Sequence, residues 1–347
     1  MLTGLVVGKF CPLHKGHEAL IAFAQARCDR LVILSYTKPE FPDCPPGRRA
    51  AWLAALYPEA TRLVLDDAAL AAFATTQGAP SRTLPHNDAP AEDHRAFVAW
   101  ACRTMLRLTV QRVFTSEDYG DGFADALARD FGHKVEHIVF DPARSGVPVT
   151  GTELRGDRSL HRAFLSEPVR RSLVRRVALI GGESTGKTVL AAALAADLGT
   201  CWVPEYGREL WEQRGGELRY EDMLAIAQEQ VARENRARAD AEGWLICDTT
   251  PLVTAFYSEA LFGRIDTALE ALAERYYDHL FLCAADFPFV QDGTRRDAAF
   301  RQRQNDWYRE RLDRAGVSYT VVSGPLADRR AHVRGHLGRP ALAPAPI

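Results

Sequence analysis

Two histidines, His14 and His17, lie three residues apart in the segment GKFCPLHKGH, which covers residues 8–17. An apolar, β-branched run precedes this segment and apolar residues at helical spacing follow it, so the sequence predicts a strand-to-helix turn. The start of a helix presents unpaired N–H groups and the positive end of its dipole, which attract phosphate. Gly8 and Gly16 allow close backbone approach, and both imidazoles can donate hydrogen bonds to phosphate oxygens or to a developing charge.

A zinc site is the less favoured interpretation of these histidines. The pairs His133/His137 and His332/His336 have H-x₃-H spacing, but no C-x-x-C pair exists in the sequence to complete a finger-type site. Ordinary turn histidines without a chemical role are the other alternative. Phosphate binding is the prediction for this turn, and the two alternatives stay open.

A second phosphate-binding pattern lies in the middle of the chain, where residues 181–188 fit G-x-x-x-x-G-K-[ST]. A predicted strand precedes it and an Ala/Leu-rich helix follows it, which is the context of a P-loop. The loop N–H groups can wrap the β-phosphate of ATP, Lys187 can reach the β and γ oxygens, and the Thr188 hydroxyl can ligate Mg²⁺. The predicted ATP-binding residues are Gly181, Gly182, Glu183, Ser184, Thr185, Gly186, Lys187 and Thr188.

Two acidic residues follow predicted strands beyond this loop. Glu205, with Tyr206 and Arg208, comes just past a short strand, and Asp248 ends the apolar strand WLICD, where a P-loop protein keeps a carboxylate near Mg²⁺. Either carboxylate can take the proton of a hydroxyl nucleophile, so Glu205 and Asp248 are both candidate general bases. Thr188 and Asp248 are the predicted metal ligands. A surface ion-pair turn is the alternative for the Glu205 stretch.

A basic segment, FVQDGTRRDAAFRQRQ, lies between a predicted strand and a predicted helix. It carries Asp292, Arg295, Arg296 and Arg301. A lid over the phosphates needs such charges, because they neutralise the charge of a transferring phosphoryl group. The alternative is a solvated basic helix without a function.

Two further polar stretches follow strands in the N-terminal half. The stretch PVTGTELRGD places Thr150, Thr152 and Arg155 at the start of a helix, where hydroxyl and N–H groups are phosphate donors. Arg155 adds a bidentate, charge-assisted contact in the next turn. The other stretch, TSEDYGDGFA, contains Ser116. Ordinary helix capping is the alternative for both.

The elements that must position these residues alternate along the chain. Strands are predicted over residues 31–36, 62–65, 111–115, 135–140, 177–180, 244–247, 279–283 and 318–322. Helices are predicted over residues 48–57, 93–108, 122–131, 221–241, 252–262, 266–278 and 297–315. This alternation predicts an α/β fold with two parallel-sheet domains.

The charged segment LSEPVRRSLVRR, residues 165–176, is the predicted seam between these domains. The expected limits are 1–168 for the first domain and 172–338 for the second, followed by a disordered tail over 339–347. Residues 78–90 have the composition of a mobile surface loop.

Composition excludes several classes of protein. The 347 residues are 47% hydrophobic and 25% charged, with a net charge of −2, so the chain offers no bulk attraction for nucleic acid or anionic membranes. No run approaches the length of a membrane span, and the N-terminus lacks the pattern of a signal peptide. The seven cysteines are scattered like buried free thiols. We therefore expect a cytoplasmic protein without membrane or nucleic-acid partners.

The N-terminal motifs resemble a known superfamily. Gly8, Phe10, Pro12, His14, Gly16 and His17 fill the pattern G-x-F-x-P-x-H-x-G-H of the nucleotidyltransferases that join a phosphate to AMP from ATP. The stretch V-T-G-T-E-L-R resembles the I-S-G-T-x-I-R element that closes their active site, with Thr150 in place of serine. TSEDYGDGFA resembles their segment near the adenine and ribose. The resemblance implies a Rossmann-like domain that binds ATP through Gly8, Lys9, Phe10, His14, His17, Ser116, Thr150, Thr152 and Arg155.

The combination of this domain with G-G-E-S-T-G-K-T, E-Y-G-R and D-G-x-R resembles the NadR-type bifunctional proteins of NAD synthesis. In that family the kinase phosphorylates nicotinamide riboside to the mononucleotide, and the first domain adenylylates the mononucleotide to NAD. The implied catalytic residues are His14, His17, Arg155, Lys187, Glu205 and Asp248. Arg295 and Arg296 join the P-loop in binding ATP. The implied substrate-binding residues of the kinase are Glu205, Tyr206, Arg208, Asp248, Tyr257 and Asp292.

The resemblance also implies cofactors and partners. ATP and Mg²⁺ are expected, with small-molecule substrates and a possible homo-oligomer. Some members of the family carry a helix-turn-helix module before the transferase, and this sequence is expected to lack it, since Gly8 follows the N-terminus almost at once. Three alternatives remain: a regulatory sensor of NAD or ATP, an active kinase beside a weak first domain, and a pair of enzymes with other substrates.

Overall fold

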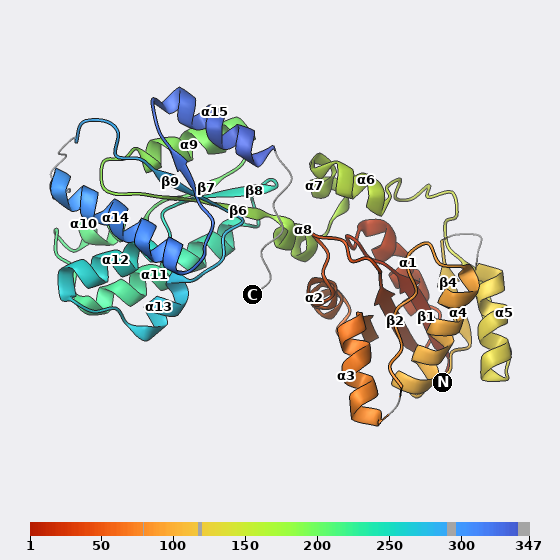
Figure 1. Cartoon of the computed structure of the whole chain (residues 1–347). Coiled ribbons are helices and arrows are strands. Elements are labelled where there is room, and N and C mark those ends of the chain that lie inside the picture. The colour runs from red at the N-terminus through yellow and green to blue at the C-terminus, as the bar shows by residue number, and fades with distance from the viewer. Residues whose placement is uncertain (79, 117–119, 290–295, 339–347) are drawn as a thin grey trace. The chain divides into compact units, whose positions relative to one another are not determined.

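The computed structural model describes residues 1–78, 80–116, 120–289 and 296–338. The chain divides into two compact units, Met1–Leu173 and Val174–Ile347. Each unit has a five-stranded parallel sheet covered by helices (Figure 1), so the predicted fold class is confirmed. The expected domain limits, 168 and 172, both fall within α8 (Glu167–Leu173), the last helix of the first unit.

The first sheet has the strand order β3-β2-β1-β4-β5, and neighbouring strands run parallel. Its strands are β1 (Thr3–Gly8), β2 (Arg30–Tyr36), β3 (Thr61–Leu65), β4 (Arg112–Thr115) and β5 (Glu136–Val139). From β1 the chain moves outward through β2 and β3, then crosses back to β4 on the other side of β1. Ligands of such sheets bind at the carboxyl ends of the strands beside this reversal.

The helices of the first unit cover both faces of its sheet (Figure 1). Neighbouring side chains of a strand point to opposite faces, so Val6 packs with residues of α1, α2 and α8, whereas Leu5 packs with residues of α3, α4 and α5. The helices are α1 (Lys15–Gln25), α2 (Pro46–Leu56), α3 (Asp67–Gln77), α4 (Ala91–Trp100), α5 (Gly120–Phe131), α6 (Gly151–Gly156), α7 (His161–Phe164) and α8.

The second sheet has the order β10-β9-β6-β8-β7, again parallel. Val177 of β6 packs with α9 and α15 on one face, and Ala178 packs with α12 and α14 on the other. The strands are β6 (Arg175–Ile180), β7 (Trp202–Val203), β8 (Trp244–Asp248), β9 (His279–Cys283) and β10 (Thr320–Val322). The helices are α9 (Lys187–Leu198), α10 (Tyr206–Gln213), α11 (Tyr220–Ala237), α12 (Pro251–Phe262), α13 (Thr267–Ala273), α14 (Ala298–Arg314) and α15 (Leu326–Leu337).

Several elements differ from the prediction. The helix predicted over 93–108 is α4 followed by a π-helical turn (Ala101–Met105), closed by a bond from Leu106 N–H to the Ala101 carbonyl at 3.1 Å. The helix predicted over 266–278 is the shorter α13. Neither α3 nor α15 was predicted, because Leu70 and Phe73 are the only large apolar residues of α3 and α15 has few apolar residues to mark a helical stripe.

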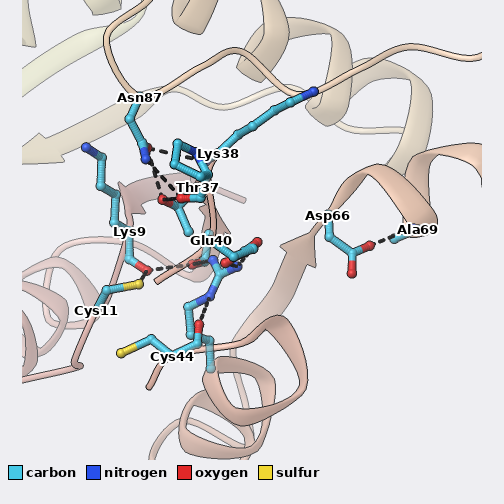
Figure 2. Close-up of polar contacts among 12 residues, drawn as sticks. Lys9, Cys11, Thr37, Lys38, Glu40, Cys44, Asp66, Ala69 and Asn87 are labelled. Atoms are coloured by element: carbon cyan, nitrogen blue, oxygen red, sulfur yellow. Dashed lines mark hydrogen bonds and ion pairs between the residues drawn. The ribbon is translucent and has the colours of Figure 1, made fainter. Parts of the chain in front are cut away.

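The segment predicted to be a mobile surface loop is partly anchored to the first sheet. The Leu84 side chain is buried, and its N–H donates to the Asp67 carboxylate at 2.8 Å. The Asn87 N–H donates to the Lys38 carbonyl at 2.7 Å, and Figure 2 shows Asn87 beside Thr37 and Lys38. The predicted disordered tail, 339–347, lies outside the described residues. None of the described helices is long and apolar enough to cross a membrane.

Candidate active sites

The first cavity, of about 780 Å³, opens where β1 and β4 end. Its lining includes the first-domain residues predicted to bind ATP, which are Gly8, Lys9, Phe10, His14, His17, Ser116, Thr150, Thr152 and Arg155. The structure therefore brings together three motifs that are far apart in the sequence. Parallel strands place their carboxyl ends at one edge of the sheet, which is why the motifs converge.

The two histidines form the start of α1. His14 is its N-cap residue, and its Nδ1 accepts from Gly16 N–H at 3.1 Å and from His17 N–H at 3.4 Å. His17 returns the interaction, because its Nδ1 accepts from His14 N–H at 3.4 Å. The rings stack with centroids 3.7 Å apart, and Phe10 packs edge-on against His17. These bonds fix both tautomers, since an Nδ1 that accepts leaves the proton on Nε2.

Both histidines are held neutral. Burial, aided by the charge of Arg144, lowers the pKa of His14 to about 4. Burial also lowers the pKa of His17 well below its usual range, with smaller contributions from His14 and Arg144. Each ring therefore offers one Nε2–H donor and no charge. A phosphate oxygen is an acceptor that suits such donors.

Arg155 joins the second motif to the first. One of its Nη atoms donates to the Cys11 carbonyl and the other donates to the Thr152 hydroxyl at 2.9 Å. Its guanidinium lies 4.2 Å from the centroid of the Phe41 ring. Gly151 permits this approach, because a Cβ there would lie 3.0 Å from the Cys11 carbonyl oxygen. The Arg155 charge is thus held at the cavity by the turn that carries the histidines.

The Thr150 hydroxyl already has a protein partner. It caps α6 by accepting from Glu153 N–H at 3.2 Å, and it donates to the Glu153 carboxylate at 2.8 Å. This is the capping alternative stated for the threonine from the sequence. Its assignment to ATP stays a prediction, and its contribution to the site through α6 is structural.

A buried arginine stabilises the end of β1, directly before the histidine turn. Arg49 on α2 is fully buried; it donates to the Cys44 carbonyl at 3.1 Å and forms a two-bond pair with Glu40 at 2.8 and 2.9 Å. It also donates to the Ser35 hydroxyl at 2.7 Å, and that hydroxyl donates to the Lys9 carbonyl at 3.2 Å. Figure 2 shows Lys9, Glu40 and Cys44 around this network. The carbonyl end of β1 is therefore fixed by a desolvated, fully paired charge.

The second cavity, of about 520 Å³, lies at the P-loop between β6 and α9. Gly181, with a φ of +145°, needs to be glycine, because a Cβ would also lie 2.7 Å from the Cys283 carbonyl. Lys187 donates to the carbonyls of Gly181 and Gly182 at 2.9 and 3.0 Å. Its ammonium thus lies within the loop that would hold phosphate, and it must leave these carbonyls to bind phosphate oxygens. Gly181, Glu183, Ser184, Thr185, Gly186, Lys187 and Thr188 all line the cavity, whereas Gly182 is covered.

Glu183 ties the P-loop to its neighbours. Its carboxylate accepts from the Tyr257 hydroxyl at 2.9 Å and from Arg296 N–H at 2.7 Å. Side chains of α14 also bind the loop backbone, since Gly182 N–H donates to Asn305 and Glu183 N–H donates to Gln304. Tyr257 and Arg296 line the cavity, and their assignments to the substrate and to ATP stay predictions. Of the other three residues predicted in the lid, Asp292 and Arg295 lie outside the described residues. Arg301 on α14 donates to the Phe287 carbonyl at 3.0 Å and is not part of the cavity wall.

The two predicted acids lie close to Lys187 in different environments. Asp248 is fully buried at the end of β8, and neither carboxylate oxygen has a hydrogen bond of good geometry among the described residues. Burial raises the pKa of Asp248, although Lys187, Thr188 and Arg208 lower it. Glu205 lines the cavity at the start of α10, and burial likewise raises its pKa against the charge of Lys187.

Tyr206 and Arg208 are placed differently from one another. Arg208 lines the cavity with a nitrogen 4.0 Å from the Glu205 carboxylate. The Tyr206 ring packs under the guanidinium of Arg233, 4.4 Å from the ring centroid, and is not part of the cavity wall. The prediction that Tyr206 contacts the substrate thus finds no support in its position, because the ring is used in packing.

Comparisons with known proteins agree with both halves. Residues 176–329 match the AAA_28 family of AAA domains. The trifunctional NAD biosynthesis/regulator protein NadR of Salmonella typhimurium is 28% identical over 309 residues, which are 84% of this chain and 71% of that protein. NadR of Escherichia coli is 27% identical over 314 residues, with the same shares. The chain is a relative of the NadR proteins.

Two crystal structures of NadR share this fold over nearly the whole chain. NadR in complex with NAD and AMP-PNP gives a TM-score of 0.67 at 17% identity, over 97% of this chain and 95% of that one. NadR in complex with NR gives a TM-score of 0.66 at 18% identity, over 99% of both chains. The predicted resemblance to NadR-type proteins is therefore confirmed.

Besides Arg49, two further arginines of this NadR relative were not predicted. Arg144 lines the first cavity and lowers the pKa values of both histidines; its only sequence signal is its place in DPARSG, just after β5. Arg329 on α15 is buried and donates to the Thr185 and Gly324 carbonyls at 2.8 Å, and it also pairs with Asp286. It fixes the P-loop as Arg49 fixes the first turn. No motif marks Arg329, because α15 itself was not predicted.

Proposed function

We propose that the chain makes NAD from nicotinamide riboside in two ATP-dependent reactions. The second unit phosphorylates the 5′-hydroxyl of the riboside, and the first unit transfers AMP from ATP to the resulting mononucleotide. One observation carries this proposal: the chain holds two separate cavities, each at the carboxyl ends of parallel strands and each built around a phosphate-binding turn. Relationship to the NadR proteins supports the choice of substrates.

In the first cavity, a phosphate oxygen of the mononucleotide attacks the α-phosphorus of ATP in line with the leaving pyrophosphate. The new P–O bond forms as the bond to the β-phosphate oxygen breaks, so no protein nucleophile is needed. The Nε2–H donors of His14 and His17 and the charge of Arg155 are positioned to stabilise the charge that moves to the pyrophosphate. Catalysis here consists of positioning and charge stabilisation by groups that the protein already holds in place.

In the second cavity, Glu205 is the proposed general base. It lines the cavity, whereas Asp248 is fully buried, and its raised pKa brings it closer to that of an effective base at neutral pH. Glu205 takes the proton of the 5′-hydroxyl as the oxygen attacks the γ-phosphorus and ADP leaves. Lys187 moves from its two loop carbonyls to the phosphates during this reaction.

The residues beside Lys187 fit a magnesium site. Asp248 offers two buried carboxylate oxygens that make no hydrogen bond of good geometry among the described residues, and Thr188 offers a hydroxyl next to them. Mg²⁺ prefers oxygen ligands, and it is usually held by one or two carboxylates together with substrate phosphates. We therefore propose that Asp248 and Thr188 hold Mg²⁺ with ATP. When bound, the ion neutralises charge on the phosphates.

The test is to incubate the purified protein with Mg·ATP and nicotinamide riboside and to separate the products by chromatography. NAD is the expected product. His17→Ala should stop the sequence at the mononucleotide, and a variant of Lys187 should make NAD only when mononucleotide is supplied. Mononucleotide alone from the unmodified protein would limit the activity to the kinase, and no product would exclude the proposed substrate.

The cytoplasmic location stays a prediction, in keeping with seven free thiols.

A further inference from the structure

The kinase cavity holds a buried hydrogen-bond donor that the mechanism above does not use. Gln230 lies on the inward face of α11, which also carries Met223 and Ile226. Its side chain is 2% exposed and lines the cavity. Helical spacing would favour an apolar residue at this position, since the preceding turns of the same face are apolar. A polar residue there needs a reason.

The orientation of the Gln230 amide is fixed by the backbone. Tyr206 N–H donates to Gln230 Oε1 at 3.0 Å, so the other branch of the amide must be the nitrogen. This Nε2 is buried, and neither of its hydrogens has an acceptor among the described residues. A buried donor without a partner costs about 1–3 kcal/mol, and few are kept in folded proteins without a use.

Gln230 lies between two ends of the cavity with different chemistry. Glu205, the neighbour of Tyr206, lies at the phosphate end, where the charge of Lys187 lowers its pKa against the effect of burial. Away from the P-loop the cavity wall is apolar and is formed by residues including Trp211, Met223 and Ile226. A flat ring suits such a wall, and a hydroxyl attacking phosphate must lie near Glu205. Gln230, which carries the free donor, therefore lines the part of the cavity that a nucleoside would fill.

We propose that Gln230 determines substrate specificity in the kinase by donating a hydrogen bond from Nε2 to an oxygen acceptor of the nucleoside. The acceptor is the carboxamide oxygen of the base or a ribose hydroxyl, which share this chemistry. The proposal rests on the proposed kinase function. An apolar wall discriminates weakly among rings of similar size, whereas a buried donor rejects a ligand that leaves it unpaired. Gln230 would thus supply selectivity that the phosphate motifs cannot.

The first variant for the test is Gln230→Met, which keeps the length of the side chain and removes the Nε2 donor together with the Oε1 acceptor of Tyr206 N–H. We expect kcat/KM for nicotinamide riboside to fall roughly tenfold, mainly through KM, because one uncharged hydrogen bond is lost. The KM for ATP should not change. Gln228→Met is the matched control, because Gln228 is exposed on the same helix. An unchanged KM for ATP checks that the second unit of each variant is folded, and adenylylation of supplied mononucleotide checks the first unit.

Substrate analogues separate substrate binding from a purely structural role. Pyridine riboside lacks the carboxamide, and 2′-deoxy and 3′-deoxy nicotinamide ribosides each lack one hydroxyl. The ratio of kcat/KM between the unmodified protein and Gln230→Met should be about ten with nicotinamide riboside and close to one with the analogue that lacks the acceptor. Loss of the effect with pyridine riboside assigns the carboxamide, and its loss with a deoxy analogue assigns the hydroxyl.

Other results would overturn the proposal. An equal ratio with every analogue would mean that Gln230 only holds Tyr206 N–H, and a ratio near one with nicotinamide riboside would mean that its donor is not used. A raised KM for ATP alone would move the contact to the phosphates. If the unmodified protein does not phosphorylate nicotinamide riboside, the proposed function fails, and the same ratios are measured with the ribonucleoside or deoxynucleoside that it does phosphorylate.

Discussion

The two cavities differ in how the protein itself partners their polar groups. In the first, His14 and His17 cap one another's backbone, and Arg155 is bonded to the Cys11 carbonyl and to Thr152. In the second, both Asp248 oxygens and the Gln230 nitrogen are buried without a hydrogen bond of good geometry among the described residues. The first site is thus organised by the protein, and the second is completed by what it binds.

This difference follows from the chemistry proposed for each site. Adenylyl transfer as proposed needs only fixed donors around a moving charge, so every group can be held before the substrates arrive. Phosphoryl transfer needs a carboxylate for a cation and a lysine that can move, so strong internal bonds to these groups would compete with the ligand. We expect ligands to stabilise the second unit far more than the first, since an unpaired buried group gains most when a partner binds.

The largest expected effect is the loss of kinase activity in Lys187→Met. The variant keeps the length of the side chain and removes the charge that is proposed to bind the γ-phosphate. We expect the rate of mononucleotide formation to fall roughly 10²- to 10³-fold, as for other groups that stabilise transferring charge. Adenylylation of supplied mononucleotide is the internal control and should not change. A loss smaller than about tenfold would remove Lys187 from the mechanism, whatever its place in the loop.

The next largest expected effect is that the unfolding free energy of the first unit depends on pH through His14. The pKa of His14 is about 4 in the fold, against an ordinary value of 6.5, so the unfolded chain binds the proton more strongly. The contribution of His14 is fully present above about pH 6.5 and is lost as the pH falls toward 4. One proton corresponds to about 1.4 kcal/mol per pH unit, or roughly 3 kcal/mol over this window. Denaturant unfolding of the full chain at several pH values measures it.

Much of both sites could be predicted because their residues are local in the sequence. The P-loop and the histidine turn each combine a strand end, a turn and a helix start within about ten residues, and parallel strands then bring such turns to one edge of a sheet. Asp248 could be predicted for the same reason, since a carboxylate that ends an apolar strand must lie at that edge.

The unpredicted residues act across long distances in the sequence. Arg49, Arg144 and Arg329 lie outside the phosphate motifs, and only packing shows that they support or charge the two turns. Gln230 lies on a helical face that the sequence marks as core. Tyr206 shows the converse case: it belongs to a motif beside the site, but its ring packs against Arg233, so its contact with the substrate stays a prediction. A motif fixes where the backbone goes, and the direction of each side chain depends on its neighbours.

A pair of variants at His14 separates its two roles in the first site, the capping of α1 and the donation of a hydrogen bond from Nε2. Asparagine is a good N-cap residue, so His14→Asn should keep the cap of α1 and lose only the Nε2–H donor. We expect it to slow adenylylation roughly 10²-fold without lowering stability at pH 8. His14→Ala should slow the reaction equally and also cost about 1 kcal/mol of stability, because the cap is lost. Both variants should remove the His14 part of the pH dependence. Equal stability of the two variants would contradict the capping role.

The smallest expected effect is a gain of stability, whereas the preceding substitutions are expected to cause losses. It tests the second site. Asp248→Asn replaces a buried carboxylate that makes no hydrogen bond of good geometry among the described residues by a neutral amide, so the unfolding free energy measured without Mg·ATP should rise by about 1–2 kcal/mol. The pKa of Asp248 is raised in the fold, so its charge disfavours folding increasingly as the pH rises from about 4 through that raised pKa. The gain in the variant should therefore be larger at pH 7 than at pH 4.

Added Mg·ATP should reverse the order of stability of the two proteins, because the unmodified protein then gains a ligand that the variant binds poorly. Thr250, whose hydroxyl is also buried without a hydrogen bond among the described residues and which is not part of the cavity wall, offers the control Thr250→Val, which should show no such reversal. If Asp248→Asn were less stable without ligand, the carboxylate would have to be paired within the fold, and the two cavities would not differ in the way described.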